Sequence, residues 1–261
     1  MIELDVDARG VATLALARPE KHNALSQALI DDLTAVAARI AADPAIRVVV
    51  LTGQGASFCA GGDLGWMQDQ MAGDAAAKRV AAQSLAQMLG AINTLPQPVI
   101  GRVQGNAFGG GVGMACVCDV AIAADHAKFG LTETKLGLIP ATIGPYVLAR
   151  MGEAMARRVF MSGRLFDAAE AVDLGVLAKA VPVAALDEAI EAEVVPYLQC
   201  APDAVATAKA FARTLGPVID ESVIARSIDA LIAQWEGRSA KEGISAFFER
   251  RKPDWAVTSA S

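Results

Sequence analysis

The chain has 261 residues, of which 54% are hydrophobic and 20% are charged, and its formal net charge is −6. A chain this long and apolar can bury a large core, so the composition excludes a disordered protein. The acidic balance and short basic runs argue against nucleic-acid binding as a main function, because that function needs a basic stripe. Gln, Asn, Gly and Pro interrupt the uncharged stretches, so we expect no membrane span.

The N-terminus and the histidine and cysteine residues indicate the cellular location of the protein and whether it binds a metal. The opening sequence MIELDVDARG lacks the basic start and apolar run of a signal peptide, so we predict a cytoplasmic protein. With only His22 and His126 present, a three-histidine metal site is impossible, and we expect no metal. Cys116 and Cys118 are too close for a C-x-x-C site, so we predict four reduced, buried thiols, at 59, 116, 118 and 200.

The first two-thirds of the chain alternate between strands, loops and helices. Predicted strands cover residues 2–6, 11–17, 46–52, 99–103 and 119–124. Predicted helices cover residues 27–42, capped by Ser26, then 74–93 and 110–117. The strand–loop–helix unit occurs at least three times, which predicts an α/β fold of stacked repeats.

The last third of the chain is expected to be helical. Amphipathic patterns predict helices over residues 185–198, 202–215, 218–235 and 239–250. No strand pattern follows residue 185, so this region should cover the α/β core or a partner subunit.

Several nucleotide and hydrolase motifs are missing from the sequence. There is no G-x-x-x-x-G-K-[ST] phosphate loop and no G-x-S-x-G nucleophile elbow. The run Gly109–Gly113 follows a strand and opens a helix, but its spacing does not match G-x-G-x-x-G. These observations argue against the corresponding nucleotide and serine-hydrolase sites.

Two small-residue loops follow consecutive predicted strands. They contain residues 57–64 and 105–111 and should emerge at the same edge of the core. One backbone N–H from each loop could bind a single oxygen, which is the arrangement of an oxyanion hole. The alternative is that both loops are tight turns where helices pack closely on strands, and the composition of the loops does not decide between them.

Glu133 is the best candidate for proton transfer. It precedes the apolar turn at residues 136–140, where loss of solvation should raise the pKa of a carboxyl group toward neutrality. The alternative is an exposed glutamate paired with Lys135. Asp63 competes for the catalytic role, but its position better suits the N-cap of a helix.

Seven segments, taken together in this order and spacing, resemble one known family. They are Arg18–Leu25, Phe58–Leu64, Val103–Gly111, Cys118–Asp119, Lys128–Gly130, Glu133–Pro140 and Phe247–Pro253. The chain thus resembles the enoyl-CoA hydratase/isomerase (crotonase) superfamily over nearly its whole length. The resemblance implies a crotonase-type spiral of ββα repeats over residues 1–195 and a C-terminal helical trimerisation region over residues 196–261. It also implies a homotrimer or a hexamer (a dimer of trimers).

The resemblance also implies the ligand and the residues around it. The substrate would be an acyl-CoA thioester that carries coenzyme A itself, with no other cofactor. Its carbonyl oxygen would lie between the N–H groups of Gly62 and Gly110, with Glu133 as the catalytic carboxyl group. The implied coenzyme A contacts are Arg18, Lys21, Ala60, Asp63 and Leu64, with Arg251 and Lys252 reaching a neighbour's site. The implied acyl pocket contains Trp66, Met67, Phe108 and Pro140.

One position departs from the family pattern. Standard hydratases have two glutamates around the attacking water, and the first corresponds to Gly113 here. One general acid–base group contributes roughly 10²–10⁴-fold in rate, so hydration of crotonyl-CoA should be poor unless another group substitutes. We predict a single-glutamate hydratase that adds water in the syn sense. The alternatives are a Δ3,Δ2-enoyl-CoA isomerase with Glu133 as proton shuttle, and a non-catalytic acyl-CoA-binding protein.

Two segments suggest a branched substrate. Residues 60–67 and 139–146 resemble bacterial methylglutaconyl-CoA hydratases of leucine breakdown and their terpenoid-degrading relatives. Such a substrate carries a carboxylate, so its pocket should offer a cation or several donors. Lys78 and Arg79, on the helix after the first loop, are the candidate cations.

Overall fold

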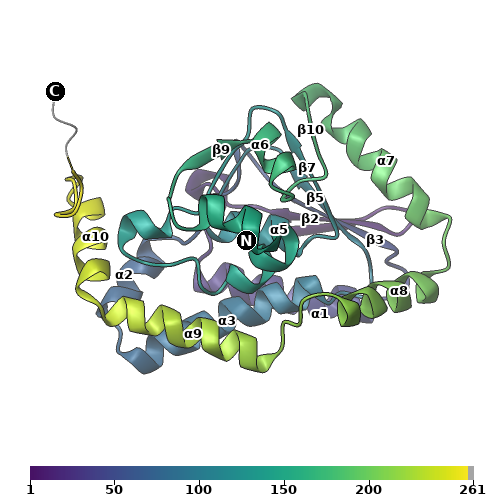
Figure 1. Cartoon of the computed structure of the whole chain (residues 1–261). Helices are drawn as coiled ribbons and strands as arrows, with labels where there is room; N and C mark the ends of the chain where they lie inside the picture. Colours follow the sequence, from purple (N-terminus) through teal and green to yellow (C-terminus); the bar gives the residue numbers. More distant parts are fainter. Residues whose placement is uncertain (258–261) are drawn as a thin grey trace.

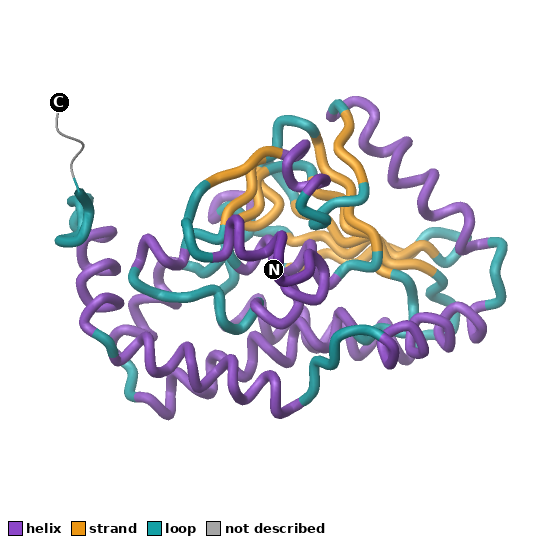
Figure 2. The backbone as a smooth tube through the Cα atoms, viewed as in Figure 1, coloured by secondary structure: helices purple, strands orange, loops and turns teal. Residues whose placement is uncertain are grey.

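The strands of the computed structural model, which describes residues 1–257, form two sheets (Figures 1 and 2). The larger sheet has the order β1-β2-β3-β5-β7-β10, and the smaller has the order β4-β6-β8-β9. The larger comprises β1 (Ile2–Val6), β2 (Val11–Leu16), β3 (Val48–Gly53), β5 (Val99–Val103), β7 (Val120–Ala124) and β10 (Lys179–Val181). The smaller comprises β4 (Ser57–Cys59), β6 (Asn106–Phe108), β8 (Lys128–Gly130) and β9 (Leu165–Asp167).

Successive strands alternate between the two sheets. In the pairs β3/β4, β5/β6 and β7/β8, the first strand joins the larger sheet and the second joins the smaller one. Pairing is parallel from β2 to β10 and from β4 to β8, while β1 and β9 run antiparallel to their neighbours. Each step therefore repeats a strand–strand–helix unit, which confirms the predicted α/β spiral.

Three helices of the core match those predicted over residues 27–42, 74–93 and 110–117, and the other three were not predicted. The core helices are α1 (Gln27–Ala42), α2 (Leu64–Ala72), α3 (Ala75–Asn93), α4 (Gly110–Val117), α5 (Gly144–Phe160) and α6 (Ala168–Asp173), with short 3-10 turns η1 (Pro19–Lys21), η2 (Glu133–Leu136) and η3 (Val183–Ala185). The Ser26 hydroxyl accepts a hydrogen bond from the Leu29 N–H at 3.3 Å, so α1 begins where the cap predicts. Asp74 caps α3 in the same way through the Ala77 N–H.

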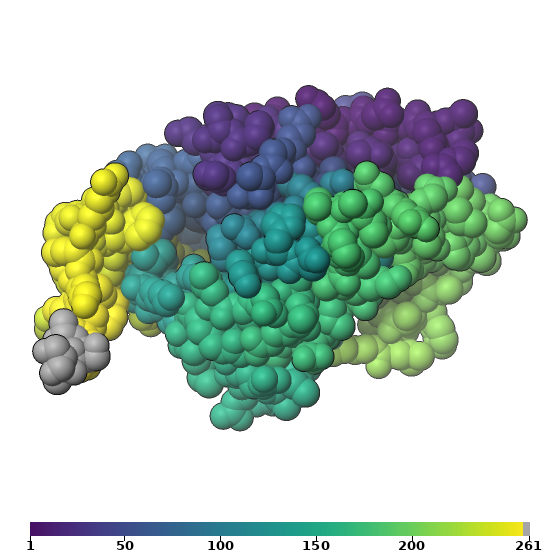
Figure 3. Space-filling view, turned by 90° about the horizontal axis from the view of Figure 1, so that it is seen from above, coloured from purple at the N-terminus to yellow at the C-terminus, as the bar shows by residue number. Residues whose placement is uncertain are grey.

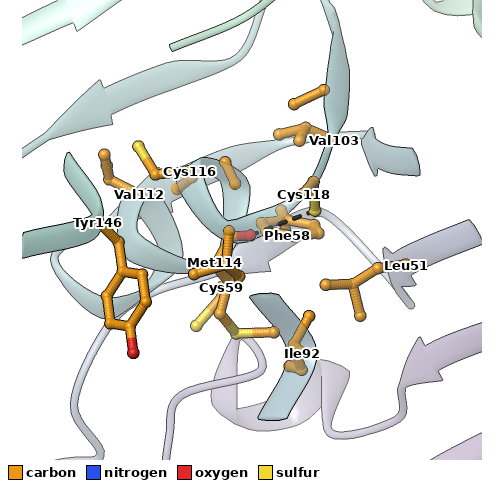
Figure 4. Close-up of a cluster of buried hydrophobic side chains, with 14 of the residues drawn as sticks. Leu51, Phe58, Cys59, Ile92, Val103, Val112, Met114, Cys116, Cys118 and Tyr146 are labelled. Atoms are coloured by element: carbon orange, nitrogen blue, oxygen red, sulfur yellow. Dashed lines mark hydrogen bonds between the residues drawn. The ribbon is translucent and has the colours of Figure 1, made fainter. Parts of the chain in front are cut away.

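The centre of the core is built around α4. Val112, Met114 and Cys116 on this helix are buried, and Figure 4 shows them near Phe58 and Tyr146. Cys59, Cys116 and Cys118 are buried, and loss of solvation raises the pKa of each thiol to about 12. Cys200 is exposed, however, so the prediction of four buried thiols is wrong at that position. Cys200 follows the C-cap of the helix at residues 186–198, where the core no longer covers the chain.

The C-terminal third is helical, as predicted. It contains α7 (Leu186–Leu198), α8 (Pro202–Leu215), α9 (Glu221–Glu236) and α10 (Arg238–Phe248). The predicted boundary between residues 195 and 196 falls inside α7, which packs on strands of the larger sheet. Helix α9 runs along α3, and α10 stands at one end of the molecule near α2 (Figures 1 and 3).

The C-terminal helices pack on two earlier parts of the chain in one small apolar cluster. Trp235, Ala240 and Ile244 from α9 and α10 pack with Met67 and Leu138. The C-terminal helices therefore close one side of the region where α2 and η2 lie. Within residues 1–257, none of the helices is long and apolar enough to cross a membrane.

Candidate active site

The two glycine-containing loops lie next to each other because their strands do. Strands β4 and β6 are neighbours in the smaller sheet, with Ser57 opposite Asn106. A methyl group on Gly61 would lie 2.9 Å from the Phe108 carbonyl oxygen and 3.7 Å from the Gly110 nitrogen. Gly61 also has a φ of +91°, which only glycine adopts readily. Glycine is therefore required where the loops touch.

Each loop presents a backbone N–H group that has no internal partner. Leu25 holds the first loop, since its N–H donates to the Gly61 carbonyl at 2.7 Å and its carbonyl accepts from the Asp63 N–H at 3.0 Å. Gly62 lies between these two bonds, and Gly110 is the first residue of α4. Within residues 1–257, neither the Gly62 N–H nor the Gly110 N–H donates a hydrogen bond. Two such amides can bind one oxygen and stabilise negative charge on it.

Glu133 is placed beside this pair of amides by the third strand of the smaller sheet. Strand β8 pairs with β6, and the Gly109 N–H donates to the Gly130 carbonyl at 2.9 Å. Glu133 opens η2, three residues after β8. A methyl group on Gly109 would lie 2.9 Å from Oε1 of Glu133, so the carboxyl group lies against the turn that precedes α4.

The surroundings of Glu133 favour its neutral form. Its Oε2 is buried and, within the described residues, has no hydrogen-bond partner. Burial raises the pKa of Glu133 to about 7, while a hydrogen bond from its own backbone N–H opposes part of that rise. Lys135 is exposed, whereas Oε2 of Glu133 is buried without a partner, so the predicted alternative of an exposed glutamate paired with Lys135 is wrong. The carboxyl group can therefore exchange a proton near neutral pH.

Glu133, Gly62 and Gly110 line one cavity of about 490 Å³, which we call the Glu133 cavity. The sequence-predicted residues Ala60, Leu64, Trp66, Met67, Phe108 and Pro140 line it as well. Most of the remaining wall is apolar and includes Leu25, Ile30, Leu85, Leu138, Ile139, Ile143, Leu231, Trp235 and Phe247. A small set of polar groups in an apolar cavity is typical of a small-molecule site.

Other predicted coenzyme A contacts do not line this cavity. Arg18 donates to the Ala24 carbonyl, the Ser26 hydroxyl and Asp63 Oδ2, the last at 3.2 Å. Asp63 caps α2 through the N–H groups of Gly65 and Trp66. Both side chains therefore hold the loop around Gly62 in place, as the capping position of Asp63 suggests.

The cationic residues at the surface are also outside the cavity. Lys21 is exposed in η1, and Lys252 is exposed after α10. Arg251 pairs with Glu242 and Glu249 of its own chain. That Arg251 and Lys252 reach a neighbouring subunit's site stays a prediction.

The two candidate cations for a substrate carboxylate lie elsewhere. Lys78 donates to Glu236 at 2.6 Å, and Arg79 donates to Asp229 at 2.6 Å, so both join α3 to α9. The prediction that they line the acyl pocket is wrong, because they lie on the α3 face that packs against α9. Among residues 1–257, Lys135 is the one cation that lines the cavity.

Position 113 has no room for a side chain. Gly113 is buried in α4, and a methyl group there would lie 2.5 Å from Cγ2 of Ile143. Gly113, which matches a glutamate in the family that the sequence resembles, is thus covered by Ile143 at the start of α5. Thr142 and Ile143 also line the cavity and were not predicted, although the turn at Pro140 places them close to Glu133 in the sequence. Nor were Leu231, Trp235 and Phe247 predicted, because they carry no local signal of a site.

Comparisons with known proteins agree with this arrangement. The family model described as enoyl-CoA hydratase/isomerase matches residues 7–258. An enoyl-CoA hydratase of Alternaria alternata, ACTT6, is 36% identical over 242 residues, which cover 91% of this chain and 78% of that protein. The crystal structure of an enoyl-CoA hydratase from Shewanella pealeana is 34% identical, has a TM-score of 0.80 and covers 97% of this chain and 95% of its own. Pseudomonas aeruginosa AtuE is 36% identical with a TM-score of 0.79 and covers 98% of this chain and 99% of its own.

Proposed function

Because this chain is an enzyme of the enoyl-CoA hydratase/isomerase (crotonase) family, we propose that it adds water to the C2=C3 bond of a 2-enoyl-CoA with Glu133 as its one catalytic carboxyl group. The observation that supports this most is the buried, unpaired carboxyl group of Glu133 beside two amides without partners. A carboxyl group with a pKa of about 7 can both take up and return a proton near neutral pH.

The two amides act on the thioester. The carbonyl oxygen of the substrate accepts hydrogen bonds from the N–H groups of Gly62 and Gly110. When water attacks C3, the electrons of the double bond move toward C1 and negative charge grows on that oxygen. Fixed donors stabilise this charge more in the transition state than in the substrate. One such donor is worth about 2.7–4 kcal/mol in known oxyanion holes.

Glu133 accounts for both protons. Its carboxylate takes a proton from water as the water oxygen bonds to C3, which leaves an enolate and a neutral carboxylic acid. The acid then returns that proton to C2, so the thioester is restored and Glu133 is ionised again. The hydroxyl group and the proton arrive on the same face, which gives syn addition.

The direct test is the ultraviolet absorbance of the conjugated enoyl thioester. We expect absorbance to fall when the enzyme meets a 2-enoyl-CoA, and Glu133→Gln to abolish the fall while retaining affinity for acyl-CoA. A wild-type enzyme that leaves every 2-enoyl-CoA unchanged would contradict the proposal.

Isomerisation is the second candidate, and one observation favours it. Ile143 covers Gly113, so that side of the cavity offers carbon instead of a carboxylate for holding water. Moving a proton from C2 of a 3-enoyl-CoA to C4 needs no water, and Glu133 could carry that proton. A rise in absorbance with a 3-enoyl-CoA, without any fall with 2-enoyl substrates, would make the isomerase the better assignment.

We also propose that the acyl group is branched and carries a carboxylate, as in methylglutaconyl-CoA. Lys135 lines the cavity, and the buried Trp66 Nε1–H has no partner within the described residues, so a cation and a neutral donor are present. We expect Lys135→Met to raise KM for 3-methylglutaconyl-CoA while leaving KM for crotonyl-CoA unchanged. Equal effects on both substrates would count against a role for Lys135 in binding the carboxylate.

A homotrimer or hexamer is proposed for the assembly. Phe211 and Leu215 on α8 are 61% and 73% exposed, which suits burial against another subunit. Sedimentation velocity would report the mass directly, and a monomer at micromolar concentration would contradict this assembly.

A further inference from the structure

Three polar atoms in the walls of the Glu133 cavity are buried without a partner. Among residues 1–257 they are Oε2 of Glu133, Nε1 of Trp66 and Oγ1 of Thr142. Buried polar atoms in proteins are almost always hydrogen-bonded, and each exception calls for an explanation. Glu133 is explained by its catalytic role. Thr142, which is only 4% exposed, is not.

Thr142 and Glu133 line the same cavity, and their surroundings meet at the first turn of α4. Gly109 and Gly113 are joined by a hydrogen bond from the Gly113 N–H to the Gly109 carbonyl at 3.1 Å, so they lie one helical turn apart. The Glu133 carboxyl group lies against Gly109, and Ile143, the neighbour of Thr142, lies against Gly113. A water molecule held in a cavity needs several polar partners, and the Glu133 carboxyl group supplies only one of them.

We propose that the Thr142 hydroxyl is the second hydrogen-bonding partner of the reacting water, opposite Glu133. This inference rests on the proposed function. The attacking water uses one lone pair to bond C3 and gives one proton to Glu133, so its other O–H still needs an acceptor. A threonine hydroxyl offers two acceptor lone pairs. After the addition, the same O–H belongs to the 3-hydroxyl group of the product and still donates to Thr142.

Apart from Thr132, which also lines the cavity but is partly exposed, the other wall residues near this turn cannot take that role. Trp66 Nε1 can only donate, and the Trp66 ring packs on Gly62, since a methyl group there would lie 3.6 Å from its Cε3. Ile143 has no polar atom, and Gly113 has no room for one. Thr142 is therefore the remaining buried side chain that can accept from the water.

The test compares two ligands that differ in one hydroxyl group. The probes are a 3-hydroxyacyl-CoA and the saturated acyl-CoA of the same chain, each titrated by calorimetry. We expect Thr142→Val to weaken binding of the hydroxyacyl-CoA by about tenfold, which is one hydrogen bond, and to leave the saturated ligand unchanged. Thr142→Ser keeps a hydroxyl group and should restore the preference.

Kinetics and stability supply independent measurements. Thr142→Val should lower kcat for hydration by at least about tenfold with little change in KM, and should leave isomerisation of a 3-enoyl-CoA unchanged. It should also keep the melting temperature close to that of wild type, because the hydroxyl group bonds no other protein group among residues 1–257. A purely structural threonine would instead lower the melting temperature when replaced.

The outcomes that overturn the inference are distinct from those that overturn the proposed function. If Thr142→Val binds both ligands as wild type does, or weakens both equally, Thr142 does not hold the reacting water. Thr142→Ala gives the same comparison if the valine variant fails to fold. A wild-type enzyme that hydrates no 2-enoyl-CoA would contradict the hydratase proposal. The comparison of hydroxyacyl-CoA with saturated acyl-CoA would still decide the role of Thr142.

Discussion

Two cavities of the molecule differ in how their polar groups are satisfied. The larger, of about 940 Å³, lies between α5 and α8, and we call it the α8 cavity. In its wall Lys209 donates to Asp119 Oδ2 at 2.6 Å, and Arg150 donates to the carbonyls of Cys116 and Asp119. The Glu133 cavity has only about 490 Å³, yet three atoms in its wall are buried without partners. Unsatisfied polar groups, more than volume, therefore indicate where a ligand reacts.

The largest difference should come from removing one carboxylate in each cavity. Glu133→Gln should lower kcat for hydration by about 10³-fold, because the proton carrier is lost. Asp119→Asn in the α8 cavity should leave kcat unchanged and lower the free energy of unfolding by about 1–3 kcal/mol, because Lys209 loses its charged partner. Steady-state kinetics and urea unfolding of both variants would check this. A large loss of kcat in Asp119→Asn would break the distinction between the cavities.

A pair of glycines tests the position of the carboxyl group. Gly109 and Gly152 both have a positive φ, of +48° and +71°. Gly109→Ala would place a methyl group 2.9 Å from Glu133 Oε1, whereas nothing lies within 4 Å of one on Gly152. We expect Gly109→Ala to lower kcat by about 10²-fold, since a small displacement at the reacting centre is costly.

The matched variant, Gly152→Ala, should keep full activity. Its cost should be about 1–3 kcal/mol of stability, because φ +71° with ψ 154° is a backbone conformation that only glycine adopts readily. Thermal unfolding and initial rates would separate the two effects. Equal activity of both alanine variants would show that the Glu133 carboxyl group does not need its place beside Gly109.

The pH dependence of activity and stability should report the burial of Glu133. Hydration needs the carboxylate, so kcat/KM should fall about tenfold per pH unit below the pKa of about 7. The folded-state pKa lies above the ordinary value of 4.5, so wild type should lose stability relative to Glu133→Gln as pH rises from about 4.5 to about 7. The loss should be about 3 kcal/mol. If urea unfolding gave the same free-energy difference between wild type and Glu133→Gln at every pH, the burial of this carboxyl group would be contradicted.

The smallest expected effect is the coupling in the α8 cavity. Side chains of Lys209 and Asp119 are 10% and 30% exposed, so their ion pair is only partly screened by water. A double-mutant cycle of Lys209→Met and Asp119→Asn should give a coupling free energy of about 1 kcal/mol, with no effect on kcat. A coupling free energy of zero would mean that water screens this ion pair as fully as it screens one on an exposed surface.

Local signals predict much of the fold. Helix α1 begins at Gln27 and ends at Ala42, as the Ser26 cap and the apolar face predict, and α4 has its predicted bounds. The strands of the smaller sheet were missed, because a strand of three residues is too short to show alternation. Strands β4 and β6 lie inside the loops of residues 57–64 and 105–111.

The site was predicted only in part, because some of its contacts join segments that are far apart in the sequence. Glu133 could be named because a glutamate in an apolar turn is visible in the sequence, whereas Gly62 and Gly110 were named through the resemblance to the family. The contact of Ile143 with Gly113 depends on how α5 packs on α4, which no local pattern encodes. In the same way, the partners of Lys78 and Arg79 come from α9, about 150 residues later.

The closing of the Glu133 cavity by α9 and α10 has a consequence for the order of events during protein synthesis. Glu133 and both loop amides leave the ribosome long before Leu231, Trp235 and Phe247, which complete the wall. Domains form from the N-terminal side as the chain emerges, so the reactive groups can assemble before their apolar cover exists. A nascent chain therefore exposes the apolar wall of the Glu133 cavity until translation is almost finished. We expect a chaperone to bind the chain most readily during that interval.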